Sequence, residues 1–385
     1  HGVVVDEFPE ISMSRLRRRR SAKWTYFPAS VLPAFVAEMD FPLAAPVKRS
    51  LIDAIEIDDT GYANPAAGNL AHSFAGFAER HMSWEVDPEQ VVATTDVVGG
   101  IVSLLRQLAE PGDGVIITPP VYHPFFSVIE EVGCRVVEAP MSGGRTLDLD
   151  AIGAGFESGA RILILCSPHN PAGSVPTREE LLKVAELAER FDAWVISDEI
   201  HSPLTLPGAT HTPFLTVSDA ARERGICLIS ASKTFNLAGL GCALFVTASD
   251  RAAAMIGELP FGAKHPGHLG AIASETAFSD ADEWLARVIH QLDFNRGYLA
   301  DLLGDALPEV GYVPPEAGYL AWLDFRVLDL GDDPSEKFMQ QGHVALSAGP
   351  TFGGQGKGFA RLNIGTRPEF IEAAVNAIAK AAHCG

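Results

Sequence analysis

The stretch CLISASKTFNLAGLGCALFV, residues 227–246, determines how the rest of the chain is interpreted. It predicts a short apolar strand at 227–229, a turn of small residues, and a second apolar run after Gly239 and Gly241. Lys233 stands between the two apolar runs, where an unpaired ammonium group is costly to bury. The position suits a lysine whose amine is consumed in an imine with a carbonyl compound. The alternative is a surface lysine in a polar turn.

Two stretches upstream end apolar runs with polar residues in the same way. RILILCSPHNPAG, residues 161–173, predicts a strand followed by a loop that carries Asn170. WVISDEIHSPL, residues 194–204, predicts a strand that closes on Asp198 and His201. Ligands of open α/β sheets bind outside the carboxyl ends of the strands, so we expect these strand ends to meet at one crevice.

The side chains expected at this crevice suit pyridoxal phosphate as the cofactor. Lys233 would carry it as an imine, Asp198 would keep its pyridine nitrogen protonated, and Asn170 would contact the ring hydroxyl. Ser230 and Ser232, directly before the lysine, would bind the phosphate through hydroxyl and backbone N–H groups. Each stretch alone is a weak signal, but the three together in this order are a strong one.

The order SPHNPAG, SDEIH and SASKTFNLAGL resembles fold-type I pyridoxal-phosphate enzymes of the class I/II aminotransferase superfamily. Within it, the chain looks like the MalY/PatB group of cystathionine β-lyases, which are carbon–sulfur lyases. KWTYFPASVLPAFVAEMDF at 23–41 and PPVYHPFF at 119–126 extend the likeness over most of the chain. The resemblance implies an α/β fold: a large domain with a mostly parallel seven-stranded sheet between helices, and a smaller α+β domain.

We expect three parts along the chain. Residues 1–45 would form an N-terminal arm and a segment that contributes to the small domain and the substrate pocket. Residues 46–290 would form the large cofactor-binding domain, and residues 291–385 the small C-terminal domain. The basic run of Arg15 and residues 17–20 is expected to be a solvated part of the arm.

The resemblance also assigns roles to residues outside the three stretches. It implies that Tyr122 stacks on the cofactor and takes part in catalysis, and that His201 contacts the cofactor. It makes Arg361 and Asn170 ligands of the substrate; from the residues alone, an internal ion pair is the alternative for Arg361. It implies that Tyr62 reaches the cofactor phosphate and the substrate of a second subunit, and hence a homodimer with its active site at the subunit interface.

A second part of the phosphate site is expected at the start of a helix near residue 97. The backbone amides of Val97 and Val98 would donate to the phosphate, favoured by the positive end of the helix. The chain departs from the family pattern at three positions. Asp96 stands where the family has glycine, Glu38 stands where it has aspartate, and Gly241 stands where many aminotransferases have a phosphate-binding arginine.

Composition excludes several other classes of protein. The chain has 385 residues and a formal net charge of −20, which argues against nucleic acid as a partner. It has no apolar run of membrane-spanning length and does not open with a secretory signal. Its five cysteines are scattered without a CxxC pair, which favours reduced thiols and a cytoplasmic location. His265 and His268 lack a third ligand nearby, so no metal site is predicted.

The resemblance implies β-elimination from an amino-acid substrate, cystathionine or a related cysteine thioether, giving pyruvate, ammonia and a thiol. The alternative is an aminotransferase, and a minor one is a regulatory interaction protein that keeps a legacy active site. Spacing and composition do not choose between lyase and aminotransferase, and they do not identify the physiological substrate.

Overall fold

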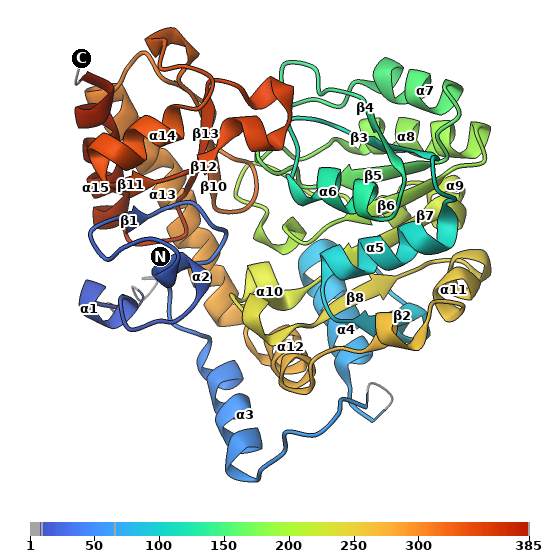
Figure 1. Ribbon diagram of the computed structural model, residues 1–385. Helices are drawn as coiled ribbons and strands as arrows, with labels where there is room; N and C mark the ends of the chain where they lie inside the picture. Colours follow the sequence, from blue (N-terminus) through green and yellow to red (C-terminus); the bar gives the residue numbers. More distant parts are fainter. Residues whose placement is uncertain (1–7, 9–10, 65–66, 384–385) are drawn as a thin grey trace.

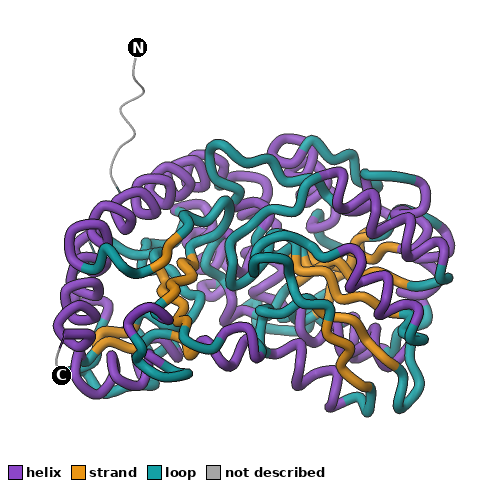
Figure 2. The backbone as a smooth tube through the Cα atoms, turned by 90° about the horizontal axis from the view of Figure 1, so that it is seen from above, coloured by secondary structure: helices purple, strands orange, loops and turns teal. Residues whose placement is uncertain are grey.

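The computed structural model describes Phe8, residues 11–64 and residues 67–383. Figures 1 and 2 show two groups of strands, one on each side of the molecule, with helices packed around both. The larger group is a seven-stranded sheet in which only β8 runs antiparallel to its neighbours, so the predicted mostly parallel sheet is confirmed. In sheet order its strands are β2 (Val91–Thr94), β8 (Ala243–Val246), β7 (Gly225–Ile229), β6 (Trp194–Asp198), β5 (Ile162–Cys166), β3 (Gly114–Ile117) and β4 (Arg135–Glu138).

The central strands are apolar throughout because both faces of this sheet are covered. Along β5, Ile162 and Ile164 pack into one apolar cluster, whereas Leu163 and Leu165 pack into the other. The first cluster is closed by the helices α5 (Val97–Leu108), α6 (Pro124–Glu131) and α11 (Asp250–Gly257). The second is closed by α4 (Leu70–Met82), α7 (Leu149–Glu157), α8 (Arg178–Arg190), α9 (Asp219–Arg224) and α12 (His268–Asp280).

The smaller group is a four-stranded antiparallel sheet with a separate pair of strands beside it. Its strands, in order, are β12 (Ser347–Ala348), β13 (Phe359–Asn363), β10 (Leu320–Asp324) and β9 (Gly311–Tyr312). The helices on this side are α13 (Asp282–Ala306), α14 (Pro334–Lys337) and α15 (Pro368–His383). The antiparallel sheet and its helices have the α+β character that was expected of the smaller part.

The N-terminal segment joins this smaller part through a strand of its own. β1 (Leu32–Pro33) pairs in parallel with β11 (Val344–Ala345), so chain segments more than 300 residues apart lie side by side (Figure 1). Two short helices precede it, α1 (Met13–Leu16) and α2 (Ala22–Thr25). The exact domain boundaries, at residues 45 and 290, stay a prediction.

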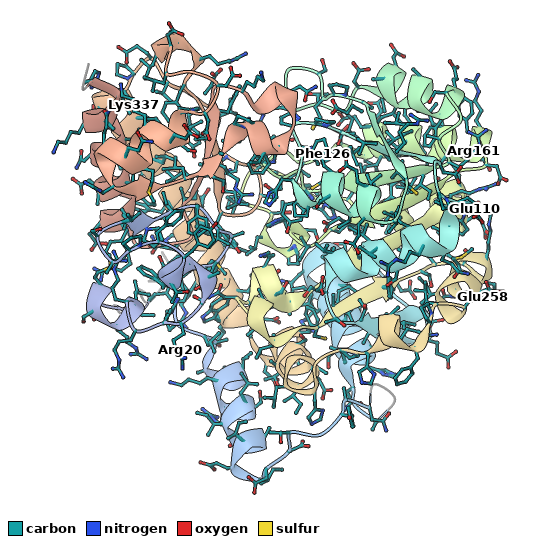
Figure 3. All side chains as sticks on the ribbon, in the orientation of Figure 1. Arg20, Glu110, Phe126, Arg161, Glu258 and Lys337 are labelled. Carbon is teal, nitrogen blue, oxygen red and sulfur yellow. The ribbon has the colours of Figure 1, made fainter. Side chains whose placement is uncertain are left out.

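The basic run near the N-terminus is only partly solvated. Arg20 is exposed at the surface, as Figure 3 shows. Arg17 instead donates to the carbonyl of Val31 at 3.0 Å. Arg19 donates to the carbonyls of Met39 and Phe41 at 3.1 and 3.3 Å. The run therefore anchors the N-terminal segment as well as carrying charge.

α3 (Ala45–Glu56) projects from the body and packs against α12 (Figure 1). In the part of the chain that the structure describes, no helix is both long and apolar enough to cross a bilayer. His265 lies against the rings of Tyr62 and Phe261, and no metal-ligand cluster occurs among these residues.

Candidate active site

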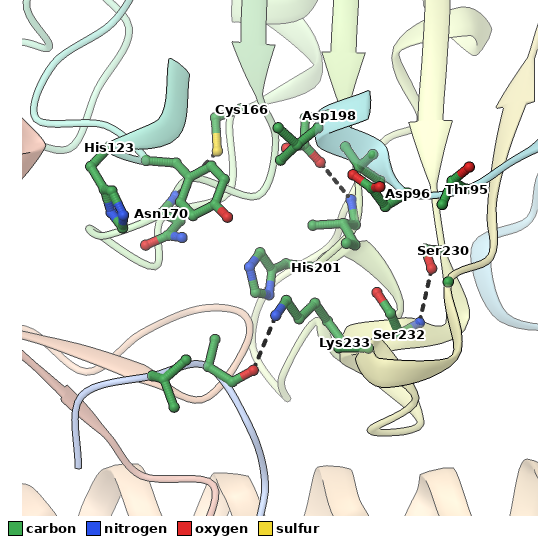
Figure 4. A pocket seen from close by; sticks show the side chains of 18 of the residues that line it. Thr95, Asp96, His123, Cys166, Asn170, Asp198, His201, Ser230, Ser232 and Lys233 are labelled. Carbon is green, nitrogen blue, oxygen red and sulfur yellow. Dashed lines mark hydrogen bonds between the residues drawn. The ribbon is translucent and has the colours of Figure 1, made fainter. Parts of the chain in front are cut away.

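A cavity of about 370 Å³ opens where the strands β5, β6 and β7 reach their carboxyl ends. This is the edge at which the sequence predicted a crevice, and Figure 4 shows its side chains converging from separate segments. The lining residues are Val36, Ala37, Thr95, Asp96, Val97, Val98, Tyr122, His123, Cys166, Asn170, Asp198, Ile200, His201, Ser230, Ser232, Lys233, Ala238, Gly241, Cys242 and Arg361. Every residue predicted for the site lines this cavity, with the exception of Tyr62.

Lys233 points into the cavity from the short helix α10 (Ala231–Thr234), which follows β7. Its Nζ donates to the main-chain carbonyl of Ala37 at 3.1 Å, and Figure 4 shows this contact across the cavity. Burial, with a smaller contribution from the charge of Arg361, lowers the pKa of Lys233 to about 8. An amine with a pKa of about 8 is roughly one-tenth neutral at pH 7, far more than an ordinary lysine, and the neutral form is what a nucleophile or a general base requires.

Asp198 is the last residue of β6 and is only 5% exposed. Its Oδ1 accepts the backbone N–H of Ile200 at 3.1 Å. Burial raises the pKa of Asp198 to about 7, although that hydrogen bond acts against the rise. A buried carboxylate in this state is stabilised by a cationic N–H group placed beside it, which is what a protonated pyridine nitrogen offers.

The neighbouring Glu199 has a different role, because successive residues of a strand end point to opposite sides. It is fully buried, and its carboxylate accepts from His211 Nε2 at 2.9 Å and from the backbone N–H of Phe214 at 2.8 Å. Of the two acidic residues in SDEIH, the first faces the cavity and the second anchors the loop behind it.

Arg361 enters the cavity from β13 of the smaller sheet and is 4% exposed. Its guanidinium donates to Asn170 Oδ1 at 2.9 Å, and to the carbonyl of Phe35 and the hydroxyl of Ser347 at 3.1 Å each. Its Nε is buried without a partner, and no carboxylate among the described residues forms an ion pair with it. The internal ion pair considered from the sequence is therefore not observed.

Tyr122 and His201 are both neutral groups at the cavity wall. Burial raises the pKa of Tyr122 to about 12, so its hydroxyl is protonated at neutral pH. Burial, reinforced by the charge of Lys233, lowers the pKa of His201 to about 3. His201 Nδ1 is also buried and has no hydrogen-bond partner in the described chain. Buried polar atoms usually have one, so this nitrogen is free to bond to a ligand.

The start of α5 supplies the predicted backbone amides, and it explains one departure from the family pattern. Asp96 is the N-cap of this helix, and its carboxylate accepts the N–H of Gly99 at 2.8 Å. The capping bond uses Gly99, so the amides of Val97 and Val98 remain at the cavity wall. Asp96 therefore replaces the family glycine as a helix cap, while it adds a negative charge near the expected phosphate.

The two serines before Lys233 are not equivalent. Ser230 donates its hydroxyl to the carbonyl of Cys242 at 2.6 Å and accepts the N–H of Ser232 at 3.0 Å. The hydroxyl of Ser230 is thus used within the protein, whereas that of Ser232 lines the cavity. Position 241 has a φ of +66°, which favours glycine, so an arginine at this position would be strained.

Tyr62 lies outside the cavity of its own chain. It is 90% exposed, and its ring packs against His265 with centroids 6.0 Å apart. A role at a second subunit's site stays a prediction.

The N-terminal segment was expected to contribute to the substrate pocket, and Val36 and Ala37 of the loop 35–40 line the cavity. The contacts that hold this loop were not predicted. Asn236 bonds both the N–H and the carbonyl of Met39 at 2.9 Å, and Asn363 donates to the carbonyls of Val36 and Glu38 at 2.7 Å. These contacts use the backbone of the loop, which carries no sequence signal. The side chain of Glu38 accepts from Ser21 at 2.7 Å and does not line the cavity, although its charge raises the pKa of Lys233.

His123 and Cys166 also line the cavity without having been predicted for it. His123 follows Tyr122 directly, and burial and Arg361 lower its pKa. Position beside a predicted site residue was the available signal for His123. Cys166 closes β5 at the edge where ligands bind, and that place in the strand was its signal.

The arrangement of these groups fits pyridoxal phosphate. Backbone amides at the start of α5 and the hydroxyl of Ser232 lie at one end, as a phosphate needs. Asp198 lies deep in the cavity for the ring nitrogen, Tyr122 offers a flat ring, and Lys233 offers the amine. The volume lies within the ~300–1,000 Å³ typical of small-molecule sites.

Comparisons with known proteins point the same way. The family model described as aminotransferase class I and II matches residues 42–378. The cystathionine beta-lyase of Corynebacterium glutamicum is 35% identical, with 97% of this chain and 99% of that protein covered. Cystathionine beta-lyase PatB of Bacillus subtilis is 32% identical, with 90% and 92% covered. The structure of cystalysin from Treponema denticola, which contains pyridoxal 5'-phosphate, superposes with a TM-score of 0.89 at 27% identity and covers 98% and 99%.

Proposed function

Because the chain belongs to the aminotransferase class I and II family, we propose that it acts as a pyridoxal-phosphate-dependent carbon–sulfur β-lyase. The observation that carries this proposal is the single cavity that gathers Lys233, Asp198, Asn170, Tyr122 and Arg361. Relatives named cystathionine beta-lyase cover nine-tenths or more of both chains, which supports a lyase within this family.

Each residue has a role that follows from its position. When bound, pyridoxal phosphate supplies an electron sink for the negative charge that develops at the substrate Cα. Lys233 would hold the cofactor through its amine, and the same amine could take the proton from the substrate Cα, a task that suits a pKa of about 8. Asp198 keeps a proton on the ring nitrogen, which preserves the sink.

The substrate is held from the other side of the cavity. Arg361 grips the α-carboxylate in two parallel hydrogen bonds, and Asn170 orients the guanidinium through its Oδ1. Tyr122 covers one face of the cofactor ring and keeps water away from it. In the overall reaction the Cβ–S bond breaks and one water is consumed, so a cysteine thioether yields pyruvate, ammonia and a thiol.

An aminotransferase is the second candidate, since the matching family model carries that description. An assay without a keto acid separates the two. L-Cystathionine, the enzyme, lactate dehydrogenase and NADH are mixed, and loss of NADH reports pyruvate. We expect sustained turnover. If no turnover occurs until a keto acid is added, the protein is an aminotransferase instead.

We further infer a homodimer in which Tyr62 of one subunit completes the phosphate site of the other. Tyr62 lies among exposed apolar side chains around α3: Ile57 is 75% exposed and Phe261 is 78% exposed. A second copy of this chain is the occupant that would bury them, and Gly241 supplies no cation where many aminotransferases have a phosphate-binding arginine.

Mixing two inactive variants tests the dimer. A dimer formed by one Lys233→Ala subunit and one Tyr62→Ala subunit contains one site with both residues intact, so activity should reappear. Activity that stays absent after mixed dimers have formed would contradict a shared site.

The small-molecule substrate and the thiols support a cytoplasmic location as part of this proposal. Four cysteines are buried and free, namely Cys134, Cys166, Cys227 and Cys242, and Cys384 lies outside the described residues. Fractionation of the native cells should place the enzyme with cytoplasmic markers; recovery with an exported fraction would contradict this inference.

A further inference from the structure

Lys23 carries a buried charge that the proposed reaction does not use. It lies in the short helix α2 and is only 2% exposed. Its Nζ pairs with Asp40 Oδ2 at 2.8 Å, and Asp40 is itself 4% exposed. Taking two charges out of water is costly, and apolar residues of similar volume often replace such a pair without loss of stability. Stability is therefore a weak reason for this pair, and its other contacts indicate a different role.

The same ammonium group holds the loop that carries Ala37. Lys23 Nζ donates to the main-chain carbonyl of Glu38 at 3.1 Å. Asn363 Nδ2 donates to the same carbonyl, and to that of Val36, at 2.7 Å each. The carbonyls on both sides of Ala37 are thus fixed by donors that lie outside the loop.

Asp40 fixes the end of this loop and the direction of the lysine. Its backbone N–H donates to the carbonyl of Gly365 at 2.8 Å. Its Oδ1 lies 3.9 Å from Arg19 Nη1, beyond hydrogen-bond distance, so among the described residues Lys23 is its hydrogen-bonded cation. Because Lys23 bonds both the carbonyl of Glu38 and the carboxylate of Asp40, it fixes the turn of the backbone between them.

The carbonyl of Ala37 is the part of the loop that contacts a catalytic group. It accepts from Lys233 Nζ at 3.1 Å and from the hydroxyl of Tyr319 at 3.1 Å. Tyr319 is fully buried. A carbonyl oxygen has two lone pairs, so these two donors use its full capacity. The carbonyl therefore offers the amine of Lys233 one defined direction across the cavity (Figure 4).

We propose that the Lys23–Asp40 pair is a positioning device, which fixes the carbonyl of Ala37 so that this carbonyl orients the amine of Lys233. A general base must lie within hydrogen-bond reach of the proton that it takes, and a misplacement of about 1 Å can cost about a hundredfold in rate. The effect on catalysis rests on the proposed function. The orientation of the amine in the cofactor-free protein does not depend on it.

The test compares two variants of the cofactor-free protein that differ only at Lys23. Asp40→Asn keeps an acceptor for Lys23 and leaves the bond from Lys23 to Glu38 in place. Lys23→Met/Asp40→Asn removes the donor and leaves no unpaired charge behind. Acetic anhydride reacts with the neutral amine, so the labelling rate of Lys233 as a function of pH gives its pKa.

The pKa of Lys233 should stay within about 0.2 of the wild-type value in Asp40→Asn and fall by about 0.5 or more in the double variant, because a carbonyl that accepts from an ammonium group favours the charged form. The charged groups that act on Lys233, namely Arg361, Glu38 and Asp198, are retained in both variants. Equal pKa values in the single and the double variant would overturn the proposal.

An exposed pair of the same two residue types provides the matched control. Lys357 and Asp332 are also 2.8 Å apart, but both are well exposed. Lys357→Met/Asp332→Asn removes the same charges and should leave the pKa of Lys233 unchanged. A fall as large as that of the buried pair would reveal a general effect of charge and would overturn the positioning role.

The wild type supplies a measurement that does not depend on the folding of any variant. In the same labelling experiment Lys23 should stay unmodified under conditions that modify Lys357, because its amine is buried and paired. Peptide mapping separates the two lysines. Modification of Lys23 at the rate of Lys357 would show that the pair is not held, and the proposal would then fail.

The consequence for the reaction is measured on the cofactor-loaded protein. The kcat of the double variant in the lyase assay should be about tenfold lower than that of Asp40→Asn, with a smaller change in KM. Equal kcat values would overturn the catalytic part of the inference. Absence of lyase activity in the wild type would instead contradict the proposed function, and the labelling profiles would still decide whether the pair orients Lys233.

Discussion

The two sides of the candidate active site are built in different ways. On the larger sheet, Asp198 and Lys233 stand at or just after the ends of buried strands, and their own side chains face the cavity. On the smaller sheet, Arg361 reaches the cavity but is held by Phe35 and Ser347, and the loop 35–40 contributes mainly carbonyl oxygens. The first side suits chemistry on a fixed cofactor. The second side suits binding of the substrate carboxylate, because Arg361 can exchange its hydrogen bonds to the protein for hydrogen bonds to the substrate.

The largest effect should follow from Asp198→Asn. This change removes the charge that stabilises a protonated ring nitrogen, so kcat should fall at least about a hundredfold. The amide keeps an oxygen for the Ile200 N–H, so the fold should persist. Steady-state kinetics with cofactor content measured in parallel checks the expectation, and wild-type kcat in a fully loaded variant would contradict it.

The same variant separates function from stability. The pKa of Asp198 lies above its ordinary value of 3.8, so folding favours the protonated acid. That contribution is complete below the unfolded pKa and is lost as the pH rises through about 7. The cofactor-free Asp198→Asn protein should therefore be at least as stable as the wild type at pH 8, by thermal unfolding.

Arg361→Lys should affect the other side of the site more selectively. A lysine keeps the charge but cannot make two parallel hydrogen bonds, so KM should rise about tenfold to a hundredfold with little change in kcat. Arg326→Lys, an exposed position that carries the same replacement, should leave KM unchanged. An equal loss in kcat and none in KM would show that Arg361 belongs functionally to the cofactor side.

The smallest effect concerns the charge that one side exerts on the other. Arg361 helps to hold the pKa of Lys233 at about 8, so Arg361→Gln should raise that pKa. The labelling rate of Lys233 by acetic anhydride in the cofactor-free protein should rise about tenfold per pH unit and level off above about pH 8. The variant should level off at higher pH. If the two rate profiles coincide, the charge of Arg361 has no effect on the pKa of Lys233.

The sequence was sufficient for the larger sheet and its edge. The strands at 162–166 and 194–198 are apolar runs that end in polar residues, and parallel strands bring such ends to one edge. The reversed direction of β8 was not readable, because an apolar run such as 243–246 carries no sign of its direction. In the sequence Asp96 is a departure from the family pattern, although aspartate before a helix is also a cap signal.

The smaller side was less predictable for a physical reason. Arg361 was assigned to the substrate through the family resemblance, and its partners Phe35 and Ser347 contribute a carbonyl and a hydroxyl from distant segments. A carbonyl oxygen is present at every residue, so no residue type marks it.

The backbone contacts of the loop 35–40 have a consequence for how this enzyme diverges over time. Lys233 and Tyr319 both donate to the carbonyl of Ala37, and Lys23 donates to that of Glu38. Selection for these contacts therefore acts on the path of the chain, because any residue at these two positions offers the same carbonyl. Sequence alignments will underestimate the importance of such positions, because a residue that acts through its main-chain carbonyl can be replaced without loss of that contact.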